Sequence, residues 1–392
     1  MRITGLRTMH ADGGWRTISY LRLETDTGLV GWSEYFESAW SPGLTGVVES
    51  LAPHVLDRDP RAFARLSSDL RAMTRISAGG LVSQAIAAVE NACIDLAGKA
   101  VGLPAYALFG GPVRDRIRTY WSHCGSFRAT RGDLFGTPPL DGTESWVALG
   151  REVRERGYTA AKTNPVLTGP DGPELANPGF APGLEHARLP GDEVIAAARA
   201  QLEALREGAG PGVDLMLDLN FSVRGEGLVR FGRALDDLGL TWLEVDLHEP
   251  AALADARSRI ATPIASCEAL YGLLGYRPYL QAGAADVVIV DVPWNGLWES
   301  LRIAALADAF EVNVAPHNFY GHLATMMSAH FCASIPNFRI MEFEGDDVPW
   351  NDDFVTHPPQ VKDGVLTVPT RPGWGCDVNE EAVRAHPPKQ AR

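Results

Sequence analysis

The chain contains little cysteine, no long apolar run and no excess of positive charge, and each of these shortages excludes a class of protein. Its five cysteines are scattered over 392 residues without a Cys-x-x-Cys pair, so we expect reduced thiols rather than a disulfide framework or a zinc site. No apolar stretch approaches the roughly 18–20 residues that a membrane-spanning helix needs. The first residues also lack an apolar stretch of signal-peptide length, which predicts a cytoplasmic protein.

Acidic residues outnumber basic ones, with 49 Asp and Glu against 35 Lys and Arg and a formal net charge of −14. Such a chain repels phosphate groups, and we find no local basic patch, so neither nucleic acid nor a membrane surface is an expected partner. The length and the hydrophobic share of 45% are those of a globular protein with more than one core. We expect a small-molecule substrate and a homo-oligomer.

Residues 1–115 are predicted to form an α+β unit, because strand-like segments precede helix-like segments without alternation. The last helix carries apolar residues at helical spacing and ends before Gly102. The expected strands are residues 2–9, 16–24 and 28–35, and the expected helices are residues 43–55, 60–75 and 80–101.

From residue 116 to residue 354, strand-like and helix-like segments alternate. Eight such units in succession predict a parallel (β/α) barrel rather than an open doubly wound sheet. The polar segment 355–392 is expected to pack back on the N-terminal unit, and the Gly- and Pro-rich stretch 163–190 to be a lid or specificity loop. The expected barrel strands lie near residues 117–122, 158–162, 213–218, 241–245, 263–267, 286–291, 312–316 and 338–342.

Ionisable side chains stand at the ends of seven of these strands, and from the third strand onward they are 23 to 26 residues apart. One β/α unit takes about that many residues, so the side chains reach the same height on successive strands. Because the carboxyl ends of barrel strands meet at one mouth, we expect the site there. The residues are Lys162, Asp218, Glu244, Glu268, Asp291, His317 and Glu342.

Asp218, Glu244 and Glu268 are predicted to bring three carboxylates within a few ångströms of one another. Unit charges about 4 Å apart repel by on the order of 4 kcal/mol at an effective dielectric constant near 20, so such a cluster needs a cation. Oxygen ligands favour Mg²⁺, with Mn²⁺ as a substitute, over Zn²⁺. Single carboxylates at strand ends are often solvated loop residues, but three in phase predict a metal site.

Asp291 and His317 follow neighbouring strands, where a carboxylate bonded to one imidazole nitrogen would leave the other free to move a proton. His322 is expected to belong to the following helix instead. Lys162 is predicted to bind a substrate carboxylate and to stabilise charge that develops on it. Glu342 is predicted to donate to or orient the same carboxylate, with Glu344 as a competitor.

These residues in this order resemble the enolase superfamily, and specifically its mandelate racemase subgroup. The similarity covers nearly the whole chain, from SQAIAAVENACIDLAGKAVGLPAYALFGG to the closing RPGWGCDVNEEAVRAHP. It implies a modified TIM barrel with an α+β capping domain, a bound Mg²⁺, and removal of a proton α to a substrate carboxylate. The implied metal ligands are Asp218 in LMLDLN, Glu244 in TWLEVD and Glu268 in ASCEAL. The implied general base is His317 in APHN, assisted by Asp291 in VIVD, and the implied electrophile is Glu342 in RIMEFE.

Two departures from the family pattern bear on the reaction. The second barrel strand of the family often ends in Lys-x-Lys, with the second lysine as a base, whereas this chain has Asn164 in that place. Asparagine cannot accept a proton at neutral pH, so the base on that face is missing. The second metal ligand usually stands in a Glu-Glu-Pro run, whereas Glu244 precedes Val-Asp, which leaves Glu249 as a rival ligand.

A site with one base suits dehydration better than racemisation, which needs a base on each face. The resemblance therefore implies a lyase that removes water from an aldonate-type acid sugar and yields a 2-keto-3-deoxy acid. His317 would take the α-proton and then assist departure of the β-hydroxyl group. A racemase or epimerase of a 2-hydroxy acid, or a carboxylate-binding protein that has lost catalysis, are the alternatives.

Substrate specificity is expected to lie in the loops 10–16, 36–44 and 163–190. The residues predicted to contact substrate are Asn164, Asn220 and His123. Further side chains that either face the pocket or have a structural role are His10, Trp15, Phe36, Trp40 and Arg128.

Overall fold

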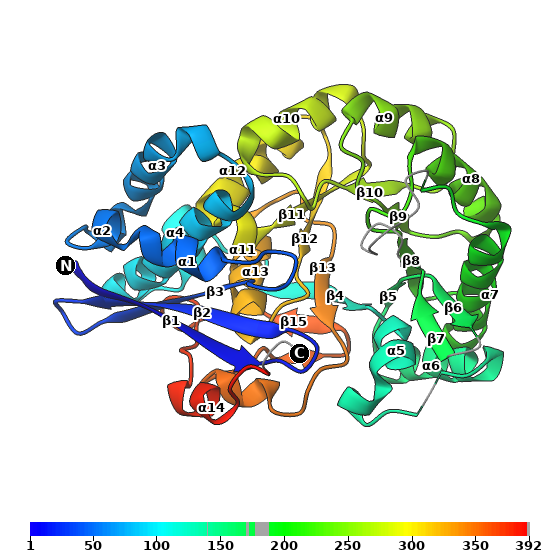
Figure 1. The fold of residues 1–392 in the computed structure, drawn as a ribbon, viewed down its shortest axis with the longest axis horizontal. Coiled ribbons are helices and arrows are strands. Elements are labelled where there is room, and N and C mark those ends of the chain that lie inside the picture. Colours follow the sequence, from blue (N-terminus) through cyan, green and yellow to red (C-terminus); the bar gives the residue numbers. More distant parts are fainter. Residues whose placement is uncertain (139, 170–171, 177–187, 390–392) are drawn as a thin grey trace.

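Two units make up the structure, a computed structural model that describes residues 1–138, 140–169, 172–176 and 188–389. Figure 1 shows the N-terminal unit, in blue and cyan, beside a curled ring of strands and helices that begins with the cyan β4 and runs through green and yellow to orange. An antiparallel sheet with helices therefore caps a β/α barrel, which confirms the predicted fold class. No helix within the described ranges is both long and apolar enough to cross a lipid bilayer.

The capping domain is a three-stranded antiparallel sheet with helices packed on it. Its elements are β1 (Ile3–Asp12), β2 (Thr17–Thr25), β3 (Val30–Tyr35), α1 (Leu44–Ser50), α2 (Ala52–Val55), α3 (Phe63–Met73) and α4 (Gly80–Val101). Leu21 and Leu23 of β2 pack with Val89 of α4 in a core of their own. The predicted helix 43–55 is divided in two, because Pro53 lacks a backbone N–H and stands in the first turn of α2.

Eight parallel strands form the barrel, close to their predicted positions. They are β4 (Arg116–Ser122), β5 (Ala160–Thr163), β8 (Asp214–Asp218), β9 (Trp242–Glu244), β10 (Ile264–Ser266), β11 (Val287–Asp291), β12 (Asn313–His317) and β13 (Met341–Glu344). Seven neighbouring pairs have ladder pairing, including β13 with β4. The ring closes between β12 and β13 through one isolated bridge from Val314 to Phe338. Continuous pairing of the eighth strand begins only at Met341, which is later than the predicted start near residue 338.

The interior of the barrel is filled by side chains from seven of its strands and from Ile340, the residue before β13, so it is a packed core rather than a channel. It contains Tyr120, Ala160, Met216, Trp242, Ala265, Val287, Ile289, Ala315 and Ile340. Because successive residues of a strand point to opposite sides, a residue two positions after a core residue also points inward, nearer the mouth. Six predicted site residues occupy such positions, namely Lys162, Asp218, Glu244, Asp291, His317 and Glu342.

Helices and short strands connect the barrel strands. The helices are α5 (Ser126–Phe135), α6 (Thr143–Glu155), α7 (Asp192–Ala209), α8 (Gly225–Leu235), α9 (Pro250–Ser258), α10 (Gly272–Ala282), α11 (Val292–Asn295), α12 (Leu297–Asp308) and α13 (His322–Ser334). The stretch 163–190, expected to be a loop, contains a hairpin of β6 (Val166–Gly169) and β7 (Gly172–Leu175). Its residues 170–171 and 177–187 lie outside the described part, and its role as a lid stays a prediction.

The segment after β13 contacts both units. β15 (Val365–Thr367) pairs with β14 (Val361–Lys362) and with β4, whereas α14 (Glu380–Ala385) lies against β1, as Figure 1 shows. Trp374 is fully buried, and its indole N–H donates to the carbonyl oxygen of Trp32 in the capping domain. This segment therefore joins the capping domain to the barrel, and the domain boundaries at residues 115 and 354 stay predictions.

Helices α6 and α7 meet at a contact that requires glycine. A Cβ atom at Gly208 would lie 1.9 Å from the carbonyl oxygen of Val147. A Cβ atom at Gly150 would lie 2.3 Å from the carbonyl oxygen of Leu205. Both distances are too short for a real contact, so a side chain at either position would push the helices apart.

Replacing Gly208 by alanine should destabilise the protein by about 1–3 kcal/mol, although alanine has the higher helix propensity. Gly46 in α1 is the matched control, because a Cβ atom there has no neighbour within 4 Å. Gly46→Ala should leave the unfolding temperature unchanged or raise it, since alanine lowers the entropy of the unfolded chain. Thermal unfolding followed by circular dichroism measures both, and equal midpoints would contradict the close contact.

Candidate active site

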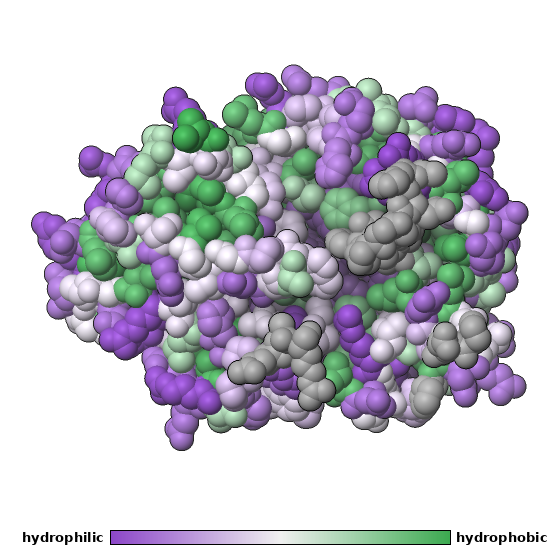
Figure 2. Space-filling model, in the orientation of Figure 1, coloured by the Kyte–Doolittle hydropathy of each residue, from purple (hydrophilic) through white to green (hydrophobic). Residues whose placement is uncertain are grey.

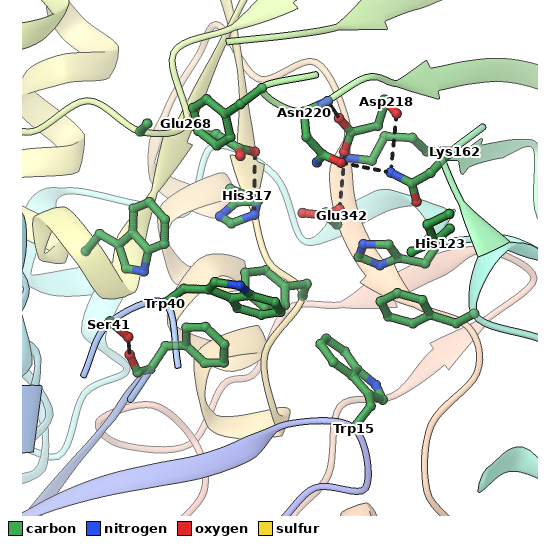
Figure 3. A pocket seen from close by; sticks show the side chains of 18 of the residues that line it. Trp15, Trp40, Ser41, His123, Lys162, Asp218, Asn220, Glu268, His317 and Glu342 are labelled. Carbon is green, nitrogen blue, oxygen red and sulfur yellow. Dashed lines mark hydrogen bonds and ion pairs between the residues drawn. The ribbon is translucent and has the colours of Figure 1, made fainter. Parts of the chain in front are cut away.

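The mouth of the barrel opens into a cavity of about 390 Å³, a volume in the range of small-molecule sites. Figure 2 shows that this face of the protein is hollowed near its middle, where apolar residues lie beside polar ones. Strand-end and turn residues form the floor, and Figure 3 shows several of them with aromatic side chains around them. The floor residues that line the cavity are Lys162, Asn164, Asp218, Asn220, Glu268, His317 and Glu342.

Lys162 stands among three carboxylates and is almost completely buried. Its Nζ atom lies 2.8 Å from Glu244 Oε1, 3.1 Å from Glu342 Oε1 and 3.4 Å from Asp218 Oδ2. Burial by itself lowers the pKa of Lys162, but these carboxylates outweigh it and hold the pKa well above its ordinary value. Lys162 is therefore a fixed cation rather than a base.

Glu268 lies beyond the end of its strand, in a turn where Cys267 has a φ of 90°. The carboxylate of Asp246 holds this turn by accepting three hydrogen bonds. The donors are the Cys267 N–H at 2.7 Å, the Ser266 hydroxyl at 2.9 Å and the Ala269 N–H at 3.1 Å. Sequence analysis missed Asp246, although the alternation of β9 continued by two residues would have placed it on the inner face.

In the described part of the chain, the three predicted metal ligands do not form a preformed ion site, and their role as ligands stays a prediction. Among the described residues, no group of three or more His, Cys, Asp or Glu side chains has the arrangement to hold an ion. Lys162 contacts Asp218 and Glu244, whereas Glu268 Oε2 lies 3.6 Å from His317 Nε2. The donors nevertheless fit a hard divalent cation, because burial raises the pKa of Glu244 and Glu268, and added positive charge would favour their ionised forms.

His317 and Asp291 form the predicted pair. His317 Nδ1 lies 2.6 Å from Asp291 Oδ2, which also accepts from the Tyr320 hydroxyl, while Asp291 Oδ1 accepts from the Trp294 N–H at 2.7 Å. The bond to Asp291 assigns the proton to Nδ1, so Nε2 is the atom that exchanges protons with the cavity. Burial by itself lowers the pKa of His317, but Glu268 and Asp291 outweigh it and raise the pKa to about 10.

The capping domain fixes the loop that follows His317. The carboxylate of Glu34 on β3 accepts from the Gly321 N–H at 2.6 Å and the Ala324 N–H at 3.0 Å, at the N-terminus of α13. Arg16 donates to the carbonyl oxygen of Tyr320 at 3.1 Å. These contacts join residues about 300 positions apart in the chain, and no local sequence signal predicts them.

His322, Glu249 and Glu344 were the alternatives to His317, Glu244 and Glu342 in the sequence analysis, and each has a different partner in the structure. His322 Nε2 lies 2.6 Å from Asp352 Oδ1, and Glu249 is exposed and caps the N-terminus of α9. Glu344 Oε1 lies 2.5 Å from His123 Nδ1. The last contact makes a second imidazole–carboxylate pair beside the same cavity.

His123 has a φ of 47°, which is unusual for a residue other than glycine and typical of functional positions. Its ring stacks on Phe127 with a centroid separation of 4.0 Å. Figure 3 shows Glu342 between His317 and His123. The cavity therefore has a histidine on either side of Glu342, which forms an ion pair with Lys162.

Asn164 and Asn220 lie near Asp218 in a network of hydrogen bonds. The Ser126 hydroxyl donates to Asn164 Oδ1 at 3.0 Å, and Asn164 Nδ2 donates to the carbonyl oxygen of Asp218 at 3.3 Å. The Asn220 N–H donates to Asp218 Oδ1 at 2.8 Å. Neither asparagine titrates, so the residue directly after β5 is an amide, where the family pattern often has a lysine.

Aromatic residues of the capping domain form part of the cavity wall. Trp15, Phe36 and Trp40 line it, whereas two other side chains that the sequence analysis weighed do not. His10 contacts Ser19, and Arg128 forms ion pairs away from the cavity.

Comparison with known proteins agrees with this architecture. Residues 8–110 match the mandelate racemase / muconate lactonizing enzyme N-terminal domain, and residues 146–382 match the enolase C-terminal domain-like family. The chain belongs to the mandelate racemase / muconate lactonizing enzyme family of the enolase superfamily. The resemblance inferred from strand-end motifs is thereby confirmed.

Relatives within the enolase superfamily have different named reactions. D-xylonate dehydratase of Haloferax volcanii is 32% identical over 98% of this chain and 88% of its own length. D-galactonate dehydratase of Verminephrobacter eiseniae is 28% identical over 98% of this chain and 94% of its own. A solved structure from Burkholderia xenovorans strain LB400, described as a candidate L-alanine-DL-glutamate epimerase bound to magnesium and fumarate, is 44% identical with a TM-score of 0.96, covering 99% of this chain and 96% of that one.

Asp246→Ala should weaken Mg²⁺ binding about 10- to 100-fold, because the turn that carries Glu268 loses three hydrogen bonds. Asp246→Asn keeps one carboxamide oxygen as an acceptor and should lose less. The matched control is Asp236→Ala, since Asp236 accepts three similar bonds from Ala261 and Thr262 before the other end of β10. Calorimetric titration with Mg²⁺ measures the affinity, and an equal loss for Asp236→Ala would contradict a specific positioning role.

Proposed function

We propose that this enolase-superfamily member is a Mg²⁺-dependent lyase that removes the proton α to the carboxylate of an acid sugar and eliminates water to give a 2-keto-3-deoxy acid. The observation that carries the proposal is that His317 at the end of β12, paired with Asp291 of β11, faces the cavity across the barrel from Asn164, the residue directly after β5. β4 and β13 separate these strands on one side, and β8 to β11 separate them on the other. Of these two opposed positions, only His317 can exchange a proton.

The substrate carboxylate is proposed to bind at Lys162. Glu342 accepts from the Ser122 hydroxyl at 2.5 Å and from the Asn318 N–H at 2.6 Å. Burial by itself raises the pKa of Glu342, but Lys162 and His317 overcome this effect and hold the pKa below its ordinary value. An ionised Glu342 accepts hydrogen bonds and does not donate, so it orients Lys162 rather than supplying a proton.

His317 Nε2 is proposed to accept the α-proton, and for this its imidazole must be neutral. The negative charge of Glu268 is the strongest influence that favours the imidazolium form, so positive charge beside Glu268 would restore the base. Magnesium held by Asp218, Glu244 and Glu268, or manganese in its place, would supply that charge near the substrate carboxylate. The Burkholderia relative, bound to magnesium and the carboxylate fumarate, supports this choice.

Elimination then uses the proton that His317 has taken. The α C–H bond breaks, its electron pair forms a C=C bond, the β C–O bond breaks, and the proton on Nε2 leaves with the hydroxide as water. The enol product becomes the 2-keto acid by tautomerisation. His123, Asn164 and Asn220 are proposed to contact substrate hydroxyl groups, and the names of the xylonate and galactonate dehydratases support an acid sugar.

His317→Asn should abolish both dehydration and exchange of the substrate α-hydrogen with deuterated solvent, because the polar replacement does not titrate. Asp291→Asn should be less severe, since it changes the tautomer and basicity but keeps the ring. A screen of acid sugars with Mg²⁺, read out as 2-keto acid, identifies the substrate, and proton NMR in D₂O follows the exchange. The control is His322→Asn, because this neighbouring histidine contacts Asp352 rather than the cavity. Native exchange rates in His317→Asn would show that another group is the base.

Removal of divalent metal by a chelator should abolish activity, and Mg²⁺ should restore it. Glu268→Gln should weaken Mg²⁺ binding sharply, because a neutral amide replaces a charged ligand. Glu249→Gln is the matched control, since this exposed glutamate caps α9. Full turnover after exhaustive chelation would contradict the metal-dependent reaction.

An epimerase that acts on a 2-hydroxy acid is the second candidate, and the His123–Glu344 pair favours it. His123 follows β4, which neighbours β5, and it could serve as a base on a second face. The name of the Burkholderia relative supports epimerisation, although the substrate in that name is built from amino acids and is not a 2-hydroxy acid. An epimerase would keep the substrate formula, and His123→Asn would block α-hydrogen exchange from one stereoisomer only. Binding of Mg²⁺ and acids without any exchange would instead indicate a non-catalytic binding protein.

A further inference from the structure

Arg131 on α5 is a charged side chain of the cavity wall that the proposed mechanism does not use. The backbone departs from helical geometry at this residue, with φ −145° and ψ 25°. The guanidinium lies over two aromatic rings, with its Cζ atom 5.0 Å from the ring centroid of Phe127 and 5.8 Å from that of Trp15. These rings contact the cation through their faces, and its N–H groups have no hydrogen-bond partner among the residues that the structure describes.

Within the described ranges, Arg131 forms no ion pair, unlike the other cations near the floor. Lys162 contacts three carboxylates, and Arg128, one helical turn before Arg131, pairs with Glu152 and Asp346. Burial is the one influence on Arg131, and it lowers the pKa. A partly buried guanidinium without a counter-ion is unfavourable, and an anion that binds there relieves this.

A continuous path of aromatic rings leads from the base to Arg131. The ring of Phe319 lies 4.8 Å from that of His317 and 5.8 Å from that of Trp15, which Arg131 covers. Aromatic surfaces along this path contact the carbon chain of a ligand, and the guanidinium at its end can bind a carboxylate through two parallel hydrogen bonds.

We propose that Arg131 binds a second carboxylate of the substrate, at the end of the molecule away from the reacting carboxylate. The inference rests on the proposed function in one respect, since it places the first carboxylate at Lys162. It narrows the substrate from acid sugars in general to hydroxy diacids, with a carboxylate at each end. Arg131 is then the residue that separates diacids from monoacids whose far end is uncharged.

The experiment measures binding, so it does not depend on turnover. The Mg²⁺-loaded protein is titrated calorimetrically with pairs of 2-hydroxy acids whose far end is a carboxylate or a methyl group. The pairs are 2-hydroxyglutarate with 2-hydroxyvalerate, and 2-hydroxyadipate with 2-hydroxyhexanoate. None of these acids has a hydroxyl group β to a carboxylate, so none can undergo the proposed dehydration.

We expect the diacid of the better-fitting length to bind about 10- to 100-fold more tightly than its monoacid partner. Arg131→Met should remove this preference, and Arg131→Lys should keep part of it, because lysine retains the charge without the planar fork. Arg151→Met is the matched control, since Arg151 is exposed on α6 and its loss changes the net charge equally.

Two results would overturn the inference and leave the proposed function intact. One is binding of the monoacids with no diacid preference at either length, and the other is a preference that survives Arg131→Met. Failure of every acid to bind would instead contradict the carboxylate site at Lys162, on which both the inference and the proposed function depend.

Discussion

Buried negative charge at the mouth of the barrel is the constraint on which the other features of the site depend. Asp218, Glu244 and Glu342 surround Lys162, and without its charge three enclosed carboxylates would repel one another strongly. Lys162 balances this charge only in part, because burial still raises the pKa of Glu244. The same imbalance that would destabilise the apoprotein makes the site receptive to a divalent cation and an acidic substrate.

The capping domain acts on this site in two ways. It supplies aromatic walls through Trp15, Phe36 and Trp40, and apolar walls strengthen charge interactions on the floor because they lower the local dielectric constant. It also binds the barrel directly, because Glu34 accepts from backbone N–H groups at the start of α13, just after the loop that carries His317. The base is therefore held by contacts from both units.

The local sequence pattern was sufficient to predict most of the barrel strands and the polar residues at their ends. The position of a polar residue two places after an apolar core residue recurs on strand after strand, and this alternation is a property of the extended chain itself. The regular spacing of strand ends predicted that Asp218, Glu244, Asp291 and His317 lie at one height of the barrel, and the alternation explains why they point inward. Glu268 differs, because its strand ends at Ser266 and the turn beyond it depends on hydrogen bonds to Asp246.

The linear order of residues was thus sufficient for the fold class, the family and the strand-end side chains, since each depends on periodicity and short motifs. Tertiary packing decided the partners of these side chains. His123 pairs with Glu344, and Lys162 contacts Glu244, because the fold brings segments together that are remote in the chain. The same kind of contact decides that Arg131 has no counter-ion among the described residues. Periodicity predicts the direction in which a side chain points, but only the closed barrel determines which charged groups lie beside it.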